Sequence, residues 1–505
     1  MRPIWALFHH PVRGLFLAAG STCQKFALAR RHIWRRLVEH FAGQVVVMSN
    51  ARLPAALPER RFSTKRELVT LEPTYSLGDI DVPEIKELMY EPTEEEMSRS
   101  LQQKLVLSQV SGNPLDVSTK IRKLSRSHEA FFPLTEFVHL ALALLTAIQN
   151  LMRARMFGNN EFLRFFFATA QLRKNAALLP LPTCIQEMAG GLFALVGASG
   201  SGKSAFIRRF TSSLPKPFFL RDAPNPSLEG MWVFPVMHLE VRVTDGVRDV
   251  AASMRQQIIA VTGTLGMESK PLPDMLSMKP ENAAITACIA VNVGLVIVDG
   301  LGIRNSNSET AAILSFLLKL RREGGIPVFI SCTPAFQQSI EHLQSEYRSL
   351  FSGQTTYLES FDAPAESASA DDDACGDFID CYWRSAVMLR EIPQPVGIKP
   401  MLHTATVGSR GLLTVALSGM DSALATLGEV DHSKMGLMHW EQLATDALRP
   451  FKGTIAAIRI AEKEAPVIHE NIAHYVDYLP ESVASTPRVR QWLIPQVKRG
   501  RRAAS

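Results

Sequence analysis

The sequence lacks the features that mark membrane proteins, secreted disulfide-rich proteins and zinc proteins. The apolar stretch 137–152 is only 16 residues long and includes His139 and Gln149, whereas a helix that crosses a bilayer needs about 20 mostly apolar residues. The six cysteines follow no zinc-ligand or disulfide-framework spacing, which favours free thiols in a reducing compartment. The sequence therefore predicts a cytoplasmic protein with no membrane partner, in which 137–152 is a buried helix.

Repeats and a disordered composition are also missing. No repeat of fixed period runs through the chain, which argues against solenoids and propellers. Hydrophobic residues make up 46% and charged residues 20% of the sequence, as in ordinary globular proteins. A chain of 505 residues is long enough for about three domains and a large core.

Acidic residues are scarce at the two ends of the chain. Residues 1–47 hold seven Lys and Arg against Glu39, a charge of +6, and residues 488–505 hold six Lys and Arg with no acid, again +6. Because the whole chain carries +5, the remaining 440 residues sum to 5 − 6 − 6, or −7. Basic ends of this kind either neutralise nucleic-acid phosphates or are solvated tails.

Residues 1–47 are expected to be an extension of the fold. They resemble a transit peptide in composition, but RGLFLAAGST is a weak apolar core for a secretory signal. Met48, followed by the polar segment SNARLPAALPERR, is an equally good start. An extension or a mis-assigned start codon is therefore favoured over a targeting signal.

The most specific motif is GASGSGKS at 197–204, which matches the phosphate-binding pattern G-x-x-x-x-G-K-[ST]. It follows an apolar strand pattern, LFALV, and precedes a helix pattern with Phe206, Ile207 and Phe210 on one face. In such a loop, backbone N–H groups and the helix N-terminus bind phosphate oxygens. The alternative is an ordinary Gly/Ser turn, which does not require a strand before it and an amphipathic helix after it. The predicted nucleotide-binding residues are Gly197, Ala198, Ser199, Gly200, Ser201, Gly202, Lys203, Ser204 and Ala205.

Two further polar residues end predicted strands. Asp299 closes GLVIVD and Thr333 closes IPVFISCT. A P-loop needs a carboxylate on a neighbouring strand for its magnesium shell, together with the hydroxyl of Ser204, while Lys203 meets the β- and γ-phosphates. Thr333 is placed to sense the γ-phosphate or the attacking water, although a Thr before Pro334 also suits a helix cap. The sequence thus predicts sites for ATP and Mg²⁺.

Strand and helix patterns alternate around the P-loop. Strands are expected at 231–243, 294–299, 326–333 and 355–360, and helices at 203–214, 247–262, 280–292, 308–324 and 336–350. This alternation predicts a three-layer α/β core with a mainly parallel sheet. Helical patterns after the core predict a C-terminal helical lid. The expected organisation is a basic extension (1–47), an N-terminal arm (48–130), the ATPase core (131–360), an acidic linker (361–377), the lid (378–460) and a basic tail (461–505).

The order of these motifs resembles that of TnsC/TniB-type transposition regulators. The resemblance extends over roughly residues 131–450 and consists of segments that follow in the family's order. They are the segment 131–160, the P-loop, the strands MWVFPVMHLEV, VGLVIVDGLG and IPVFISCTPA, the stretch EYRSLFSG and the helical GSRGLLTVALSGMDSALATLG. The resemblance implies an AAA+ ATPase that oligomerises on double-stranded DNA, works with a target-selection protein, and recruits or activates a transposase. It assigns Lys203, Asp299 and Thr333 to catalysis. It also implies that Arg348 acts on a neighbouring subunit's nucleotide, although a helix-surface arginine is the alternative.

The chain differs from the family's pattern in the arginine pair, of which Arg348 is the surviving member, and after Asp299. The family commonly has Asp-Glu at the end of the Asp299 strand, where the glutamate orients the hydrolytic water, but here Gly300 follows. Glu240 and Glu309 are the two acids that could take the place of this glutamate. Nucleotide binding is therefore expected, with hydrolysis weak or atypical.

Other functions remain open from sequence alone. A P-loop GTPase is disfavoured because no N-K-x-D motif follows the core, and a small-molecule kinase does not need basic ends. Another AAA+ ATPase, of the replication-initiation or secretion-associated type, is the enzyme alternative. A scaffold that binds ATP without turnover is the alternative from another class.

Overall fold

The computed structural model describes a large part of one compact unit, Glu72–Ser505. The described residues are 82–102, 131–156, 160–170, 178–188, 191–220, 231–264, 279–305, 308–341, 348–364, 373–426, 435–462, 470–487 and 489. The predicted basic extension 1–47 and the basic residues 490–505 lie outside them.

A parallel five-stranded sheet forms the centre of the α/β core. Its strands are β4 (Met237–Glu240), β5 (Val296–Leu301), β6 (Val328–Cys332), β1 (Leu192–Gly197) and β7 (Gln354–Leu358), in the spatial order β4-β5-β6-β1-β7. Every neighbouring pair is parallel. β1, β5 and β6 are nearly continuous apolar runs, as expected for strands covered on both faces. Because the strands are parallel, the residues that end them meet at one edge of the sheet.

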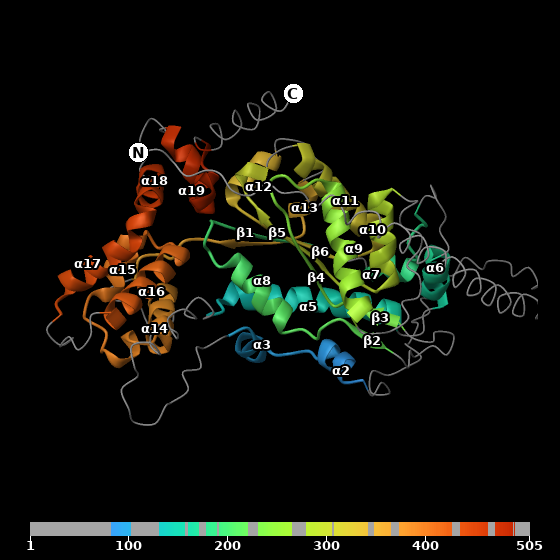
Figure 1. Ribbon diagram of the computed structural model, residues 1–505, viewed down its shortest axis with the longest axis horizontal. Coiled ribbons are helices and arrows are strands. Elements are labelled where there is room, and N and C mark those ends of the chain that lie inside the picture. Colours follow the sequence, from blue (N-terminus) through green and yellow to red (C-terminus); the bar gives the residue numbers. More distant parts are fainter. Residues whose placement is uncertain are drawn as a thin grey trace, which may run out of the picture. The chain divides into compact units, whose positions relative to one another are not determined.

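The helices that cover one face of this sheet include α5 (Thr135–Met156) and α8 (Lys203–Ser212) (Figure 1). Phe137 of α5 stacks on Phe206 of α8 with 5.0 Å between ring centroids, and Phe206 meets Phe329 of β6 edge-on at 6.3 Å. The predicted apolar face of the P-loop helix is therefore the face that packs, since Phe206, Ile207 and Phe210 are fully buried. This packing fixes the helix that begins at Lys203.

The remaining core helices include α9 (Val247–Thr264), α10 (Pro280–Ala290) and α11 (Ser308–Gly324), which pack on one another, and α6 (Asn160–Ala170) and α7 (Thr183–Met188). α12 (Pro334–Glu341) and α13 (Arg348–Phe351) pack against β1. Arg155, at the end of α5, is fully buried and donates from Nη1 to the carbonyl of Val293 at 2.9 Å. Burial lowers the pKa of Arg155 to about 10, and nearby Cys288 only partly opposes this.

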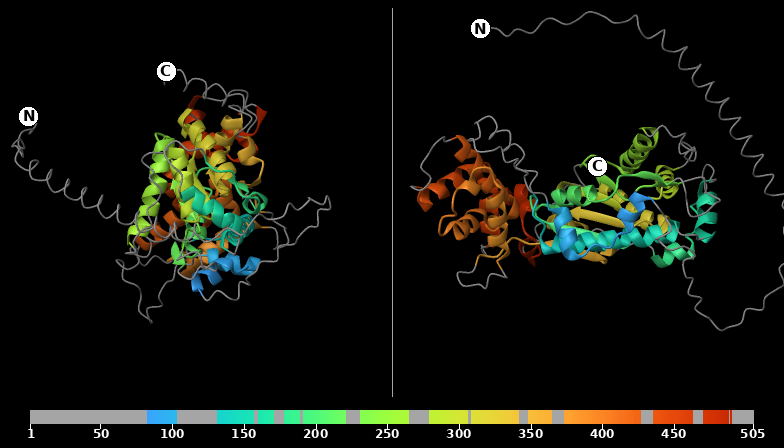
Figure 2. Two further views of the ribbon diagram at one scale, coloured as in Figure 1. Left: turned by 90° about the vertical axis from the view of Figure 1, so that its right-hand side faces the viewer. Right: turned by 90° about the horizontal axis from the view of Figure 1, so that it is seen from below.

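The part of the N-terminal arm that is described packs on the same core (Figures 1 and 2). It consists of α2 (Pro83–Met89) and α3 (Glu94–Leu101), and a capping box at Thr93 and Glu96 starts α3. Leu88 and Leu101 are fully buried in the cluster that contains the sheet. Arg209 of α8 donates to the carbonyl of Leu101 at 3.2 Å.

A second hydrophobic cluster lies in the C-terminal helical region. Its elements are α14 (Ala374–Ser385), η6 (Leu389–Glu391), α15 (Ile398–Thr406), α16 (Arg410–Thr426), α17 (Leu437–Leu448), η8 (Arg449–Phe451), α18 (Lys452–Glu462), η9 (Glu470–Tyr478) and α19 (Glu481–Ala484). Buried Asp421 of α16 accepts backbone N–H bonds from Val387, Met388 and Leu389 at 2.7–3.0 Å. The predicted α/β core with a mainly parallel sheet and a helical C-terminal region is confirmed.

Several element boundaries differ from the sequence prediction. The single strand predicted at 231–243 is two strands, because Pro235 interrupts it: β3 (Met231–Val233) pairs antiparallel with β2 (Phe218–Leu220), and β4 joins the parallel sheet. The helix predicted at 336–350 begins at Pro334, and α12 ends at Glu341. Helix α14 begins inside the segment predicted as a linker, because the Asp373 side chain accepts from Gly376 N and caps it.

The predicted buried helix is present. α5 is long and apolar enough by composition to cross a bilayer, but 56% of its most apolar window is buried inside the protein. Leu140, Leu144 and Ile148 are fully buried against the core. Among the described residues no other helix passes this test.

Candidate functional site

The loop between β1 and α8 has the backbone that its glycines predict. Gly200 and Gly202 have φ values of 84° and 97°, in the left-handed region that favours glycine. Gly202 is also the N-cap residue of α8. At the base of the loop, a Cβ on Gly197 would lie 2.7 Å from Ser201 Oγ, so the loop closes tightly on itself. Backbone N–H groups and the N-terminus of α8 are thereby presented at the carboxyl edge of the sheet.

Lys203 is folded back onto this loop. Its Nζ donates to the carbonyls of Gly197 at 2.6 Å and Ala198 at 2.8 Å, and the residue is 9% exposed. Burial lowers the pKa of Lys203 to about 8, although Cys332, Asp299 and Asp477 favour its charged form. The side chain is thus a largely desolvated cation to which no carboxylate of the described residues is bonded, which suits an incoming anion. Ser201 is buried, Ala205 is half-buried, and Ser204, the predicted magnesium ligand, is exposed.

Asp299 and Gly300 end β5 with an irregular backbone. Asp299 is 4% exposed, and its Oδ1 accepts from the N–H of Gly300 at 2.8 Å. The register with β6 shifts between Val298 and Leu301, and Gly300 has a φ of 90°. A β-bulge with a glycine in the left-handed region explains why no side chain occupies position 300.

The direction of a side chain at Gly300 is also defined. Its Cβ would lie 3.3 Å from the carbonyl oxygen of Val241, which follows β4. In the order β4-β5-β6-β1, β4 lies on the opposite side of β5 from the P-loop strand. A side chain at this position would therefore begin by pointing away from the phosphate-binding loop.

The two glutamates proposed as substitutes lie in different places. Glu240 is the register partner of Asp299, so both project from the same face of the sheet, and Glu240 is exposed. Glu309, on α11, is exposed and lies beside Gly246. Of the two, Glu240 is the one that the sheet register places next to the predicted magnesium ligand.

Thr333 caps a helix, which is one of the two roles considered for it; its role as a sensor of the γ-phosphate stays a prediction. Its Oγ1 accepts from the N–H of Phe336 at 3.3 Å, which caps α12. The same hydroxyl donates to Asp477 Oδ1 at 2.6 Å. The residue is 5% exposed at the end of β6, at the sheet edge where Asp299 and the P-loop lie. Arg348 is exposed at the first position of α13.

Asp477 is a site residue that the sequence gives no reason to select. It lies on η9, in the segment predicted as a basic tail. Its backbone carbonyl accepts from the N–H of Ser199 in the P-loop at 2.6 Å. Its Oδ1 accepts from Ile303 N at 2.8 Å as well as from Thr333. Asp477 therefore connects the C-terminal helical region to the P-loop and to the ends of β5 and β6.

Arg410 is the second residue that the sequence did not single out, although it begins a helix quoted for the resemblance. It is 9% exposed at the start of α16, with its guanidinium 4.9 Å from the centroid of the Phe361 ring and 3.5 Å from Glu136. Burial lowers its pKa, and Glu136 partly opposes this. Nε and Nη1 have no hydrogen-bond partner among the described residues. The adjacent Gly411 lies so close to the P-loop that its Cβ would be 2.6 Å from the carbonyl oxygen of Gly200.

These residues fit a nucleotide with magnesium. A hydroxyl on Ser204 and a carboxylate on Asp299 are oxygen donors of the kind Mg²⁺ prefers. Lys203 supplies the cation, and Gly200 and Gly202 keep the loop free of side chains that would block a phosphate. Among the described residues no group of three or more His, Cys, Asp or Glu side chains is placed to hold a metal ion.

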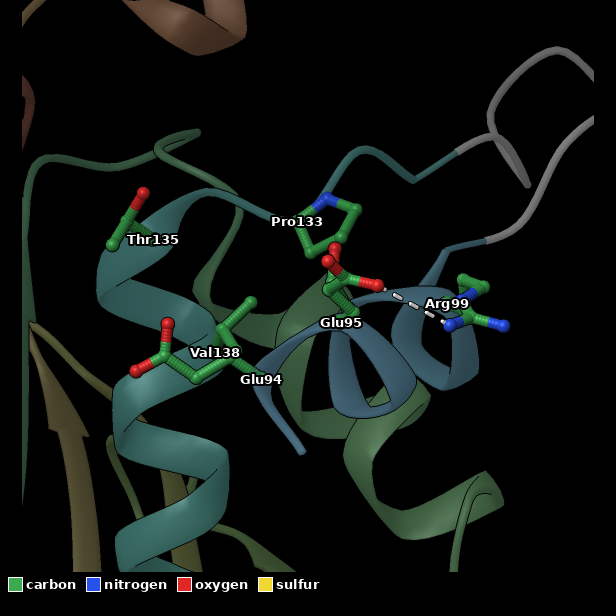
Figure 3. A pocket seen from close by; sticks show the side chains of 7 residues that line it. Glu94, Glu95, Arg99, Pro133, Thr135 and Val138 are labelled. Carbon is green, nitrogen blue, oxygen red and sulfur yellow. Dashed lines mark ion pairs between the residues drawn. The ribbon is translucent and has the colours of Figure 1, made fainter. Parts of the chain in front are cut away.

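A separate pocket lies between α3 and α5 and has about 410 Å³ of space (Figure 3). Glu95 and Arg99 at its rim form an exposed ion pair of 3.5 Å. Its other lining residues are Glu94, Ser98, Pro133, Thr135 and Val138. None of them belongs to the P-loop or to the strand ends, so this pocket is distinct from the predicted nucleotide-binding residues.

Comparison with known proteins gives only distant likenesses. No family model matches the chain, and no curated protein matches it significantly. Three similar solved structures, each 12% identical, are the Walker-type ATPase PABY2304 of Pyrococcus abyssi (62% of this chain and 85% of that one, TM-score 0.34), the Aeropyrum pernix ORC2 protein in ADPNP–ADP complexes (68% and 98%, TM-score 0.34), and Drosophila ORC bound to DNA (78% and 88%, TM-score 0.31). Values this low assign neither family nor function, so the fold assignment rests on the strand order and the P-loop.

Proposed function

We propose that this chain is an ATP-binding AAA+ regulator of DNA transposition. It assembles as an oligomer on double-stranded DNA and, with a target-selection protein, recruits or activates a transposase. The observation that carries nucleotide binding is the meeting of Lys203, Asp299 and Thr333 at one edge of a parallel sheet, beside a glycine loop. The transposition role rests on the order of motifs along the sequence, and the DNA role rests on the two basic ends.

The chain's own residues have defined tasks in this proposal. When bound, magnesium neutralises charge between the phosphate groups. Lys203 binds the β- and γ-phosphates, Ser204 and Asp299 hold the metal shell, and Thr333 contacts the γ-phosphate region. Arg410, which begins α16 beside the Gly411 that approaches Gly200 of the P-loop, is the further cation proposed to act near the phosphates; its Nε and Nη1 have no hydrogen-bond partner among the described residues. Arg348, which is exposed on α13, is the arginine proposed to act on the nucleotide of a neighbouring subunit.

Gly300 favours a switch that binds ATP with little turnover over an active hydrolase. General-base assistance contributes about 10²–10⁴-fold in rate, and the bulge at Gly300 has no side chain to supply it. We therefore expect phosphate release to stay slow in the presence of duplex DNA. Brisk turnover by the unmodified chain would show instead that another acid, with Glu240 the first to test, orients the water.

The DNA role is tested by the salt dependence of binding. We expect ATP-dependent, largely sequence-independent binding to a duplex, with a log–log slope against salt of about −5 if roughly six phosphates are neutralised. Fluorescence anisotropy from low to moderate salt measures the slope. No binding at low salt with ATP and magnesium present would remove DNA from the proposal.

A test of the C-terminal charges in DNA binding requires a variant that leaves the hydrophobic core intact. Val489 is 3% exposed in the helical cluster, so a truncation at 488 would remove a core residue. Replacing Lys498, Arg499, Arg501 and Arg502 with glutamine is cleaner, and we expect the slope to become shallower by up to about 3.6. Four exposed basic residues of the described surface form the charge-matched control: Lys216, Arg384, Arg449 and Lys452. An equal change in the control would mean that the tail has no special role.

ATP affinity is also expected to fall at alkaline pH. The buried Lys203 has a pKa of about 8, so above this pH the free protein loses the proton that phosphate binding requires. Binding then takes up one proton, and affinity falls by about tenfold per pH unit above pH 8. The neighbouring thiol does not interfere, because burial raises the pKa of Cys332 to about 12. Isothermal titration between pH 7 and 9.5, in two buffers of different ionisation enthalpy, measures the proton uptake. An ATP affinity that does not change with pH would contradict this prediction.

A further inference from the structure

The contact between Asp477 and the nucleotide-binding residues has no part in the function described so far. A backbone carbonyl and a side-chain carboxylate of one residue together bind three donors. The N–H of Ser199 donates to the carbonyl at 2.6 Å, and Ile303 N and Thr333 Oγ1 donate to Oδ1 at 2.8 Å and 2.6 Å. These donors come from the P-loop, the end of β5 and the end of β6. Asp477 therefore occupies the point where these three elements converge.

The groups around Asp477 are those that a terminal phosphate would use. P-loop N–H groups bind phosphate oxygens, and the P-loop lysine reaches the β- and γ-phosphates. Here one loop N–H already has a protein acceptor, and the Asp477 carboxylate lies close enough to Lys203 to favour its charged form. Thr333, at the sensor position, donates its hydroxyl to the same carboxylate. A carboxylate has the charge and the acceptor geometry of a phosphate oxygen pair.

The segment that carries Asp477 is anchored in the helical region on both sides of this residue. Val476 is 1% exposed and Leu479 is fully buried in the C-terminal cluster. Further along, Ser482 donates from its Oγ to Glu359 at 3.1 Å. Asp477 therefore cannot leave all three donors without a shift of the η9 backbone, because the N–H of Ser199 is bonded to its backbone carbonyl.

We propose that Asp477 is a specificity-determining residue that competes with the γ-phosphate of ATP. A nucleoside diphosphate binds with Asp477 in place, whereas a triphosphate displaces it and moves η9 away from the P-loop. ATP binding is thereby coupled to the position of the C-terminal helical region, and ADP binding is not. This inference rests on the proposed nucleotide site.

The test compares ATP and ADP affinities of the full-length chain and its Asp477→Ala variant, with magnesium present. Removing the carboxylate leaves the Thr333 hydroxyl and Ile303 N free for a phosphate, and it removes a negative charge near Lys203. We expect ATP to bind about tenfold or more tightly, since a hydrogen bond to a charged group is lost from the competing state. ADP affinity should change by less than about twofold on the same reasoning. Asp446→Ala, an exposed position on α17, is the matched control and should leave both affinities unchanged.

The possible results distinguish a failure of this inference from a failure of the proposed nucleotide site. Unchanged ATP affinity in Asp477→Ala overturns the competition, and so does an equal gain for ATP and ADP. Lost turnover with unchanged affinities overturns it as well, because Asp477 would then act on the attacking water. If the unmodified chain binds neither nucleotide, the proposed site fails too, and only that result removes both.

A second measurement covers the case in which the variant does not fold. In the unmodified chain, amide hydrogen exchange across η9 and α19 should increase with ATP and stay as in the free protein with ADP. Equal exchange in both nucleotide states would contradict the coupling.

Discussion

Replacing Lys203 with alanine is expected to lower ATP affinity by at least about 100-fold while the fold is retained. The ammonium is the positive side chain of the P-loop, and charge-assisted bonds to phosphate are the strong ones; a 100-fold loss corresponds to about 2.7 kcal/mol. The fold should persist because the two bonds made by Nζ go to loop carbonyls, and because removing a buried cation also removes its desolvation cost.

The control for this variant lies on the same helix. Arg208 is exposed on α8, so Arg208→Ala removes a positive charge near the site without touching the loop. We expect its ATP affinity to stay close to that of the unmodified chain. Isothermal titration gives both affinities, and thermal unfolding checks the fold. Unchanged affinity in Lys203→Ala would contradict the assignment of the loop as a phosphate site.

Replacing Gly300 with glutamate is expected to destabilise the protein by about 2 kcal/mol without restoring ATP turnover. A residue other than glycine in the left-handed region costs of order 1–3 kcal/mol, and the φ of Gly300 is 90°. The new Cβ would also lie 3.3 Å from the carbonyl oxygen of Val241. Because that contact is on the β4 side, the carboxylate begins its path away from the P-loop.

Two variants separate strain from chemistry. Gly300→Ala adds the strain without a carboxylate and should lose nearly the same stability. Gly263→Glu adds a glutamate at a position on α9 with nothing within 4 Å of its Cβ, and should be neutral or slightly stabilising. Urea unfolding and phosphate release with DNA present are the measurements. A clear gain in turnover in Gly300→Glu would show that the side chain reaches the water after all.

The local parts of the site were predictable because their determinants are contiguous in sequence. Gly200 and Gly202 specify the loop backbone, and the alternation of apolar strands and helices specifies a parallel sheet whose carboxyl edge collects Asp299 and Thr333. The fold class followed from the same alternation. The roles of these residues in catalysis remain predictions.

What the sequence did not predict depends on contacts between distant segments. Asp477 lies 278 positions after Ser199 along the chain (477 − 199), and no local pattern marks a carbonyl that binds a P-loop N–H. Arg410 could be read as one more polar residue on an amphipathic helix, because its significance comes from burial beside Glu136 and Phe361. Gly300 was interpreted as a missing acid, whereas the structure also gives a backbone reason for it.

Gly411 has a consequence for efforts to make this protein more robust. In an exposed helix, exchanging glycine for alanine gains up to about 1 kcal/mol of helix propensity, so a stability screen would favour Gly411→Ala in the first turn of α16. Here the added methyl group would meet the carbonyl oxygen of Gly200 at 2.6 Å and its Cα at 2.9 Å. The methyl group would therefore displace backbone rather than a flexible side chain. Stabilising substitutions chosen by consensus or helix propensity should leave Gly411 unchanged, because any gain in the helix would come with a distortion of the P-loop backbone.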